Sequence, residues 1–294
     1  MSIRALAMDA IVKRLIARSG NADVSAEIAR RYAQGPPAPA AVPPSVQKRF
    51  HVSEERVAGS PVVTLRRRDA SRGRAVIFLA GGGYAHPISS AHWQAVAQYA
   101  TDAEIDAVVP LYEVAPFGDA SRAHRFVARV LEDQIAQRGA GELYLAGDSA
   151  GGGLALSVLQ RHPEGIRAAI LLSPWLDVEL EHPAADVLER WDAILDPVEL
   201  RQWGSAWAAD LPTSDPAVSP IHGRLVGLPP VHLVSGGRDL LLPQALDAYG
   251  RLRKAGNAGS LTYSPDANHA VGLSGSATPE AKRVRDEVVR VLRS

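Results

Sequence analysis

The chain has 294 residues, and its 32 Lys and Arg side chains are balanced by 32 Asp and Glu, so the formal net charge is zero. This balance argues against nucleic acid or an anionic membrane surface as a partner. Hydrophobic residues make up 46% of the chain, as in ordinary globular proteins, and the lack of cysteine excludes disulfides, thiol catalysis and cysteine zinc sites.

The N-terminal part of the sequence has helical character. Apolar residues recur at helical spacing over 3–15, a second short helix is expected over 25–34, and a proline-rich connector follows. We therefore predict N-terminal cap helices over 1–45 and a catalytic domain over 46–294. No apolar stretch has the length of a signal peptide or the roughly 20 residues of a membrane span, so a cytoplasmic location is expected.

From residue 50 onward, short apolar runs alternate with segments of helical periodicity, such as 92–99 and 124–137. Alternation of this kind favours a mostly parallel sheet with helices on both faces. We predict an α/β fold with a central sheet of about eight strands. The strand candidates are 62–65, 75–80, 107–111, 143–146, 168–172, 231–234 and 260–263.

Residues 175–225 interrupt this alternation, because they contain no strand candidate. The segment 196–199 has the form of a capping box, and Leu200, Trp203 and Trp207 follow on one helical face. A helical insertion at this place would lie over the carboxyl ends of the strands, where open α/β sheets bind ligands. We predict that it forms a helical cap; a purely structural helical excursion is the alternative.

The segment 143–156 predicts a strand, a sharp turn and a helix, with the pattern G-x-S-x-G at 147–151. This pattern places a serine on a tight turn at the end of a strand, so that the hydroxyl stands clear of the sheet. The positive end of the following helix favours negative charge at the same point. A phosphate-binding glycine loop is the rival interpretation, but no lysine follows the glycines as a Walker loop requires. Ser149 is therefore the predicted nucleophile.

A serine hydroxyl needs a base to take its proton, and in this fold the order along the chain is serine, acid, histidine. His269 follows the last strand candidate, in a loop that can fold back over the sheet edge. The other histidines after Ser149 lie near the end of the nucleophile helix, in the insertion or within a strand candidate: His162, His182, His222 and His232. We therefore predict that His269 is the base.

The acid of the triad is predicted to be Asp239. It follows the strand candidate 231–234 through a glycine turn, a position that suits a bond to the far nitrogen of His269. Such an acid fixes the ring tautomer and stabilises the imidazolium. Asp266, which shares a loop with His269, and Asp177, which follows an earlier strand, are rival candidates, and either can be a turn or capping residue instead.

Donors for the negatively charged oxygen of the tetrahedral intermediate are expected from backbone N–H groups. Residues 81–83 are three glycines directly after the strand candidate 75–80. In this fold the residue after the nucleophile supplies one N–H and this loop supplies the others. The predicted donors are Gly82, Gly83 and Ala150; an ordinary glycine-rich turn is the alternative.

With these parts in place, the chain from about residue 50 to its end resembles the hormone-sensitive-lipase family of α/β-hydrolases. The most specific motifs are 147–152 (Gly-Asp-Ser-Ala-Gly-Gly) and the glycines at 81–83. The resemblance implies the α/β-hydrolase fold with a cap built from N-terminal helices and the insertion, and it implies the triad and the oxyanion donors named above. It also implies that no metal or organic cofactor is used. Supporting matches occur at 110–116, 172–177, 215–220 and 227–230.

The sequence departs from this family at two places. The family's glycine loop usually opens with histidine, and this chain has Ala80 there. The arginine and glutamate usual around the segment Tyr-x-x-Ala-Pro are replaced by Glu113 and Phe117. The first departure puts in doubt how the loop is held and which substrate is chosen, and the second concerns packing.

We predict a carboxylic-ester hydrolase that forms an acyl-enzyme and acts on small or medium acyl esters. A homodimer is the candidate oligomeric state. Candidate pocket residues are Tyr84, Trp175, Trp203 and Trp207, with the core of the cap as the alternative place for the tryptophans. An acyltransferase or lactone hydrolase with the same triad remains open. So does a non-catalytic small-molecule-binding member of the fold.

Overall fold

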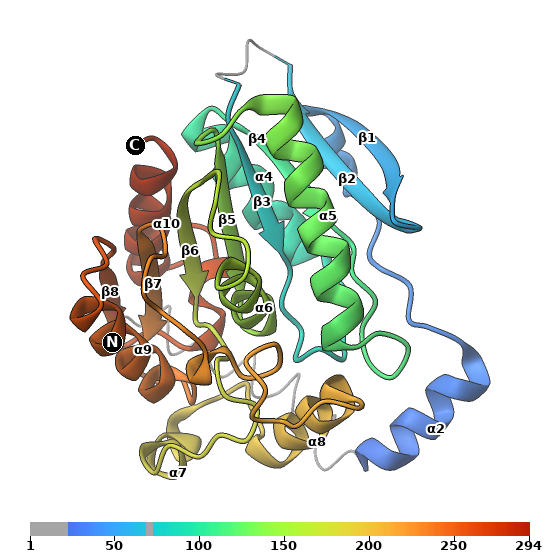
Figure 1. Ribbon diagram of the computed structural model, residues 1–294, viewed down its shortest axis with the longest axis vertical. Coiled ribbons are helices and arrows are strands. Elements are labelled where there is room, and N and C mark those ends of the chain that lie inside the picture. Colours follow the sequence, from blue (N-terminus) through green and yellow to red (C-terminus); the bar gives the residue numbers. More distant parts are fainter. Residues whose placement is uncertain (1–22, 69–72) are drawn as a thin grey trace.

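The computed structural model describes residues 23–68 and 73–294, so the helix predicted over 3–15 lies outside the described residues. An eight-stranded sheet runs through the molecule in the order β1-β2-β4-β3-β5-β6-β7-β8 (Figure 1). Its strands are β1 (Phe50–Val57), β2 (Ser60–Arg67), β3 (Ala75–Leu79), β4 (Asp106–Pro110), β5 (Leu143–Asp148), β6 (Ile166–Leu172), β7 (Val231–Gly236) and β8 (Leu261–Ser264).

The sheet is mostly parallel, as predicted. Strands β3 to β8 pair in parallel, while β2 is antiparallel to both of its neighbours, β1 and β4. The predicted α/β-hydrolase architecture with about eight strands is confirmed. Strand β1 has no counterpart among the sequence candidates, because only Phe50 in it is buried and the edge strand lacks an apolar run.

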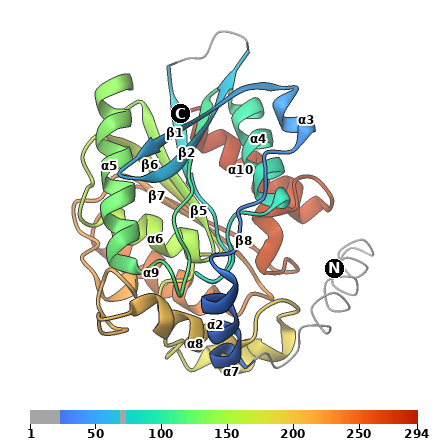
Figure 2. The same cartoon turned by 90° about the vertical axis from the view of Figure 1, so that its right-hand side faces the viewer.

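Helices cover both faces of the sheet (Figure 2). One face carries α4 (Ser90–Ala103) and α10 (Pro279–Leu292), and the other carries α5 (Ala120–Arg138), α6 (Ala150–Leu159) and α9 (Leu242–Lys254). Successive residues of a strand point to opposite faces, so Ile77 packs into one core and Phe78 into the other. Burial on both faces explains why these strands are continuous apolar runs.

Helices of the insertion and of the N-terminal part lie at the carboxyl ends of the parallel strands, where α2, α7 and α8 are seen at the bottom of Figure 1. From the insertion come α7 (Ala184–Leu188), α8 (Pro197–Ala208) and the short 3-10 helices η1 (Glu189–Trp191) and η2 (Pro220–His222), and from the N-terminal part comes α2 (Val24–Gln34). Short α3 (Pro44–Gln47) precedes the sheet, and η3 (His269–Leu273) follows it.

Helix α2 packs directly on α8. The guanidinium of Arg31 lies 4.5 Å from the ring centroid of Trp203, and it donates hydrogen bonds to the carbonyls of Ala85 and Ala115. Helix α8 begins where the sequence predicts, with the Asp196 carboxylate accepting two backbone N–H groups of the first turn. The N-terminal helix α2 and the insertion 175–225 therefore pack on each other at the carboxyl ends of the strands, and together they are called the cap below.

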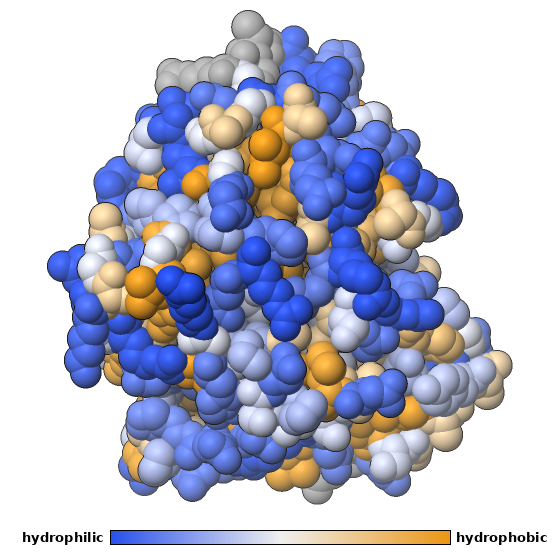
Figure 3. Space-filling model, viewed as in Figure 1, coloured by the Kyte–Doolittle hydropathy of each residue, from blue (hydrophilic) through white to orange (hydrophobic). Residues whose placement is uncertain are grey.

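The face of the molecule in Figure 3 is mainly hydrophilic, and its hydrophobic residues form small, separate patches. Within the described ranges, no helix has both the length and the apolar character needed to cross a bilayer.

Candidate active site

Ser149 lies on the sharp turn between β5 and α6. Its backbone, with φ of 51° and ψ of −122°, is in a region that residues other than glycine rarely occupy. The turn is fixed by the Ser149 N–H, which donates to the carbonyl of Leu172 at 2.8 Å. Close packing leaves no room beside it, because a Cβ on Gly151 would lie 2.0 Å from the Leu79 carbonyl oxygen. Small residues around the serine therefore permit this strained turn.

His269 and Asp239 meet at this serine. The Ser149 Oγ lies 2.9 Å from His269 Nε2, and His269 Nδ1 lies 3.0 Å from Asp239 Oδ1. Asp239 comes from the loop after β7 and is fully buried, while His269 opens η3 after β8. Because β5, β7 and β8 run in parallel, their carboxyl ends bring these three side chains to one edge of the sheet.

The charge around His269 favours its protonated form. Burial alone lowers the pKa of this imidazole, but the charge and the hydrogen bond of Asp239, with further contributions from Asp192 and Asp148, raise its pKa to about 9. Since the Asp239 carboxylate can only accept, Nδ1 carries a proton and Nε2 is the nitrogen that exchanges a proton with the serine. The arrangement can therefore move a proton away from Ser149.

The rival candidates have other partners. Both oxygens of Asp177 accept backbone N–H groups of its own turn, from Glu179 at 3.0 Å and Glu181 at 2.8 Å. His232, which the sequence places within a strand, lies 2.8 Å from the hydroxyl of Ser260 through its Nδ1. Both residues have the local structural contacts that the alternative interpretations expect.

The glycine loop after β3 lies next to Ser149, since a Cβ on Gly81 would lie 3.0 Å from the Ser149 Cβ. Gly82 and Gly83 line the same pocket as the serine. Within residues 23–68 and 73–294, the N–H groups of Gly82, Gly83 and Ala150 donate no hydrogen bond. Gly82 has a φ of 129°, and a Cβ there would lie 2.3 Å from the His86 carbonyl oxygen, so the loop requires glycine at this position.

A hydrogen-bond chain that the sequence did not reveal holds this loop. The Asp148 carboxylate accepts the Gly81 N–H at 2.9 Å and lies 3.2 Å from His92 Nε2. The Ser89 N–H donates to His92 Nδ1, so Nε2 carries the hydrogen and donates to Asp148. Asp148 could have been found from its place beside the nucleophile, whereas nothing in the helical pattern around His92 indicates this contact.

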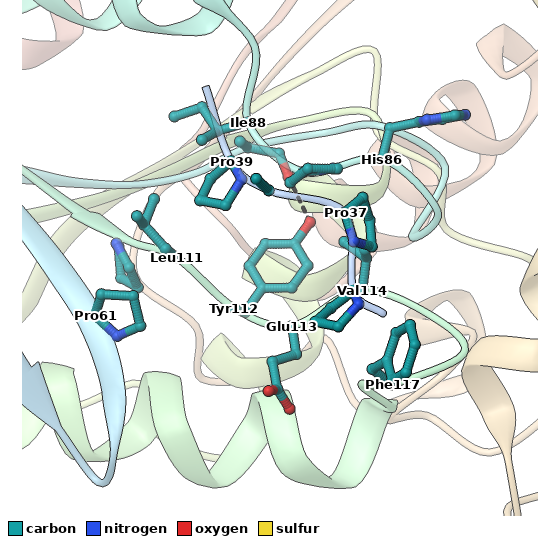
Figure 4. A pocket seen from close by; sticks show the side chains of 15 residues that line it. Pro37, Pro39, Pro61, His86, Ile88, Leu111, Tyr112, Glu113, Val114 and Phe117 are labelled. Carbon is teal, nitrogen blue, oxygen red and sulfur yellow. Dashed lines mark hydrogen bonds between the residues drawn. The ribbon is translucent and has the colours of Figure 1, made fainter. Parts of the chain in front are cut away.

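A second cavity, of about 370 Å³, is lined by Ala80, the residue before the glycine loop, and by residues of several other segments (Figure 4). The ring of Tyr112 stands in its middle, and the hydroxyl donates to the carbonyl of Ala80. Glu113 and Phe117, the two residues that depart from the family pattern near this segment, line the same cavity. Ala80, which replaces the usual histidine, is therefore anchored through its backbone by Tyr112.

The pocket above Ser149 has a volume of about 380 Å³, and both the cap and the sheet edge line it. Of the predicted pocket residues, Trp203 lines it. The prediction for Tyr84, Trp175 and Trp207 is corrected, because these side chains are fully buried and stack on one another in the core, with ring centroids of Tyr84 and Trp207 4.3 Å apart. Cap residues that the sequence analysis did not assign to the pocket also line it: Ile194, Leu195, Asp196, Glu199 and Leu200.

Known proteins resemble this chain in sequence. A family model described as the α/β-hydrolase fold matches residues 76–273. An acetyl-hydrolase of Streptomyces hygroscopicus is 29% identical over 230 residues, which cover 76% of this chain and 76% of that protein. A triacylglycerol lipase of Mycobacterium tuberculosis is 37% identical over 182 residues, or 59% of this chain and 36% of the lipase, so this chain spans only about a third of that relative's length.

Solved structures resemble it in fold. A hormone-sensitive lipase from a metagenome library superposes with a TM-score of 0.84 at 21% sequence identity, covering 100% of this chain and 98% of the other. At that level of identity the likeness concerns the fold. These matches confirm the α/β-hydrolase fold and agree with the resemblance to the hormone-sensitive-lipase family.

Proposed function

The chain belongs to the α/β-hydrolase fold family, and from this premise we propose that it is a carboxylic-ester hydrolase that works through an acyl-enzyme on Ser149. The observation that carries the proposal is the 2.9 Å separation between Ser149 Oγ and His269 Nε2, with Asp239 bound to the other ring nitrogen. The names of the two curated relatives, a lipase and an acetyl-hydrolase, agree with it.

In the first half of the proposed reaction, Ser149 Oγ attacks the carbonyl carbon of the ester while His269 Nε2 takes its proton. The carbonyl oxygen becomes negatively charged, and the N–H groups of Gly82, Gly83 and Ala150 are the proposed donors to it. The intermediate collapses when the bond to the alcohol oxygen breaks. His269 gives its proton to that oxygen, and the alcohol leaves. The acyl group stays bonded to Ser149 Oγ.

Water completes the cycle. His269 takes a proton from a water molecule as its oxygen attacks the acyl carbon, the bond from that carbon to Ser149 breaks, and the proton returns to the serine oxygen. Asp239 keeps the ring in the tautomer that this exchange needs and stabilises the imidazolium in both halves.

The size of the pocket supports the proposal that the substrates are esters with a small or medium acyl chain. Its volume of about 380 Å³ lies near the lower end of the range for ligand pockets, roughly 300–1,000 Å³. Apolar side chains of the cap, Ile194, Leu195 and Leu200, line it together with Trp203. Asp196 and Glu199 add negative charge to this wall, so we propose neutral rather than anionic esters as substrates.

A fluorophosphonate probe and a series of p-nitrophenyl esters test the proposal. We expect labelling at Ser149, and cleavage that is fastest at short to medium acyl length and falls as the chain outgrows the pocket. The proposal is wrong if the protein neither labels at Ser149 nor cleaves an ester of any length. Adding alcohols and comparing released acid with transferred acyl group separates hydrolysis from acyl transfer.

A further inference from the structure

Asp192, a residue of the cap insertion, lies against the loop that carries Asp239. Its side chain is 9% exposed. One oxygen, Oδ2, accepts the N–H of Leu240 at 2.7 Å, and the other accepts those of Ile194 at 2.8 Å and Leu195 at 3.0 Å. All three partners are donors, an arrangement that favours the ionised form of the carboxylate, which can only accept.

These bonds join two parts of the site. Ile194 and Leu195 line the pocket above the serine, and Leu240 is the neighbour of Asp239. The Asp239 carboxylate is anchored through Oδ1 alone, which accepts the Leu241 N–H at 2.9 Å besides facing His269. Its Oδ2 finds no hydrogen-bond partner in the part of the chain that the structure describes. The bond from Leu240 to Asp192 is therefore an additional anchor for this loop.

Asp192 also acts on the imidazole through its charge. It is one of three carboxylates, with Asp239 and Asp148, that oppose the effect of burial and raise the pKa of His269. In the other direction, burial and then the charge of Asp239 raise the pKa of Asp192, and the charge of His269 opposes both. Asp192, Asp239 and His269 therefore form one set of ionisable groups whose charges act on one another.

We propose that Asp192 is a positioning residue of the esterase reaction, which fixes the loop of Asp239 to the pocket wall and supports the imidazolium of His269 with a second buried negative charge. This inference rests on the proposed function. Asp192 touches neither the ester nor Ser149 in this scheme, and it acts through the other two members of its set.

The variant Asp192→Asn tests both parts of the role. Asparagine keeps one accepting oxygen for Ile194 and Leu195, but it turns an NH₂ group toward the Leu240 N–H and removes the charge. We expect kcat on p-nitrophenyl butyrate to fall about tenfold, the loss of roughly 1.4 kcal/mol of transition-state stabilisation, with a much smaller change in KM. The acid limb of the kcat/KM profile should move to lower pH, because the imidazole loses one carboxylate that favours its charged form.

Asp177→Asn is the matched control. Asp177 belongs to the same insertion, is also buried, and also accepts backbone N–H groups through both carboxylate oxygens, but its two donors both belong to its own turn. We expect Asp177→Asn to lose about as much thermal stability as Asp192→Asn, while the acid limb of its kcat/KM profile stays at the wild-type pH. If Asp192→Asn leaves the limb in the wild-type position as well, Asp192 is only structural and the proposal is overturned.

Two further arms keep the outcome decisive. If Asp192→Asn does not fold, Asp192→Ser provides a small, uncharged acceptor for the same pH measurement. Labelling of the wild type by the fluorophosphonate separates the two proposals: a wild type that labels, with variants whose pH limb does not move, contradicts the role of Asp192 alone. A wild type that neither labels nor cleaves esters contradicts the proposed function itself.

Discussion

Two regions next to Ser149 are built in different ways. In the first, His269 and Asp239 come from loops far along the chain, and their side chains are ionisable. In the second, Gly82, Gly83 and Ala150 present only backbone N–H groups, and the bonds of Asp148 to Gly81 and of Tyr112 to Ala80 hold the start of the glycine loop. The first region should respond to pH and to loss of charge, and the second should respond to changes in backbone geometry alone.

This difference shows which parts of the site can be predicted from the sequence and which cannot. Side-chain chemistry requires particular residue types at the ends of particular strands, so it leaves a trace in the sequence. A site made of backbone groups depends on how its loop is anchored, and the anchors are side chains at a distance. The predictions below test whether the two regions can be perturbed separately.

The largest expected effect comes from removing the base. His269→Ala should lower kcat for ester hydrolysis on the order of 10⁶-fold, because the serine loses the group that takes its proton. The measurement is the hydrolysis rate of p-nitrophenyl butyrate, with circular dichroism and thermal unfolding as controls for the fold. Activity within a few-fold of wild type would require a different base.

Asp239→Asn should lower kcat about 10⁴-fold while leaving His269 in place, because the amide favours the wrong ring tautomer. The same substitution removes the carboxylate that most strongly raises the pKa of His269. The acid limb of the remaining activity should therefore move to lower pH. A rate loss without any movement of the limb would contradict the charge-based description of this region.

How much of the site could be predicted follows from this contrast. The pattern around Ser149 has a strong sequence signal, and the parallel sheet explains why residues after β7 and β8, Asp239 and His269, converge on it. The fold class could be predicted for the same reason, since buried parallel strands are continuous apolar runs. Edge strand β1 could not, because its residues are mostly exposed.

The sequence could not reveal which side chains anchor the loops. His92 lies on a helix and Asp192 in an irregular stretch of the cap, and each reaches the site only through packing between elements far apart in the chain. The aromatic residues show the same limit. Composition alone cannot separate Trp203, which lines the pocket, from Trp207, which stacks on Tyr84 in the core.

In the second region, Gly82→Ala should lower kcat roughly 10²–10³-fold, the cost of losing one oxyanion donor. A Cβ at this position collides with the His86 carbonyl, and the φ of 129° is unfavourable for alanine, so the loop must shift. The pH profile should keep its shape, since no charge changes. A limb that moves with this substitution would mean that the two regions are not separable.

Gly83→Ala is the matched control for that experiment. Its φ is 61°, close to the left-handed helical region, and the nearest atom to a Cβ there is a Leu200 methyl carbon at 3.7 Å. Alanine can be accommodated here at a cost of about 1–2 kcal/mol in backbone strain. We therefore expect a smaller loss of kcat than in Gly82→Ala, measured with the same ester.

The wild-type pH profile tests the first region without a substitution. Only the neutral imidazole can take the serine proton, and the pKa of His269 is raised to about 9. The kcat/KM for a neutral ester should therefore rise more than tenfold between pH 7 and pH 9, in line with the titration of a single group. Subtracting the rate of Ser149→Ala removes spontaneous hydrolysis, and a profile already flat at pH 7 would contradict the raised pKa.

The smallest effect is expected from His92, which bonds to Asp148, the residue that in turn holds the glycine loop through Gly81. His92→Phe keeps a flat ring of similar size but leaves one oxygen of the Asp148 carboxylate without its donor, and a lost hydrogen bond to a buried charge is worth roughly 1.5–3 kcal/mol. Only the share of this free energy that displaces Gly81 weakens the binding of the transition state, so kcat should fall about tenfold. The pH limb should stay where it is, because the carboxylates facing His269 are unchanged. His92→Gln, whose amide N–H can reach Asp148, should restore most of the rate, and failure of this rescue would show that the ring acts by packing alone.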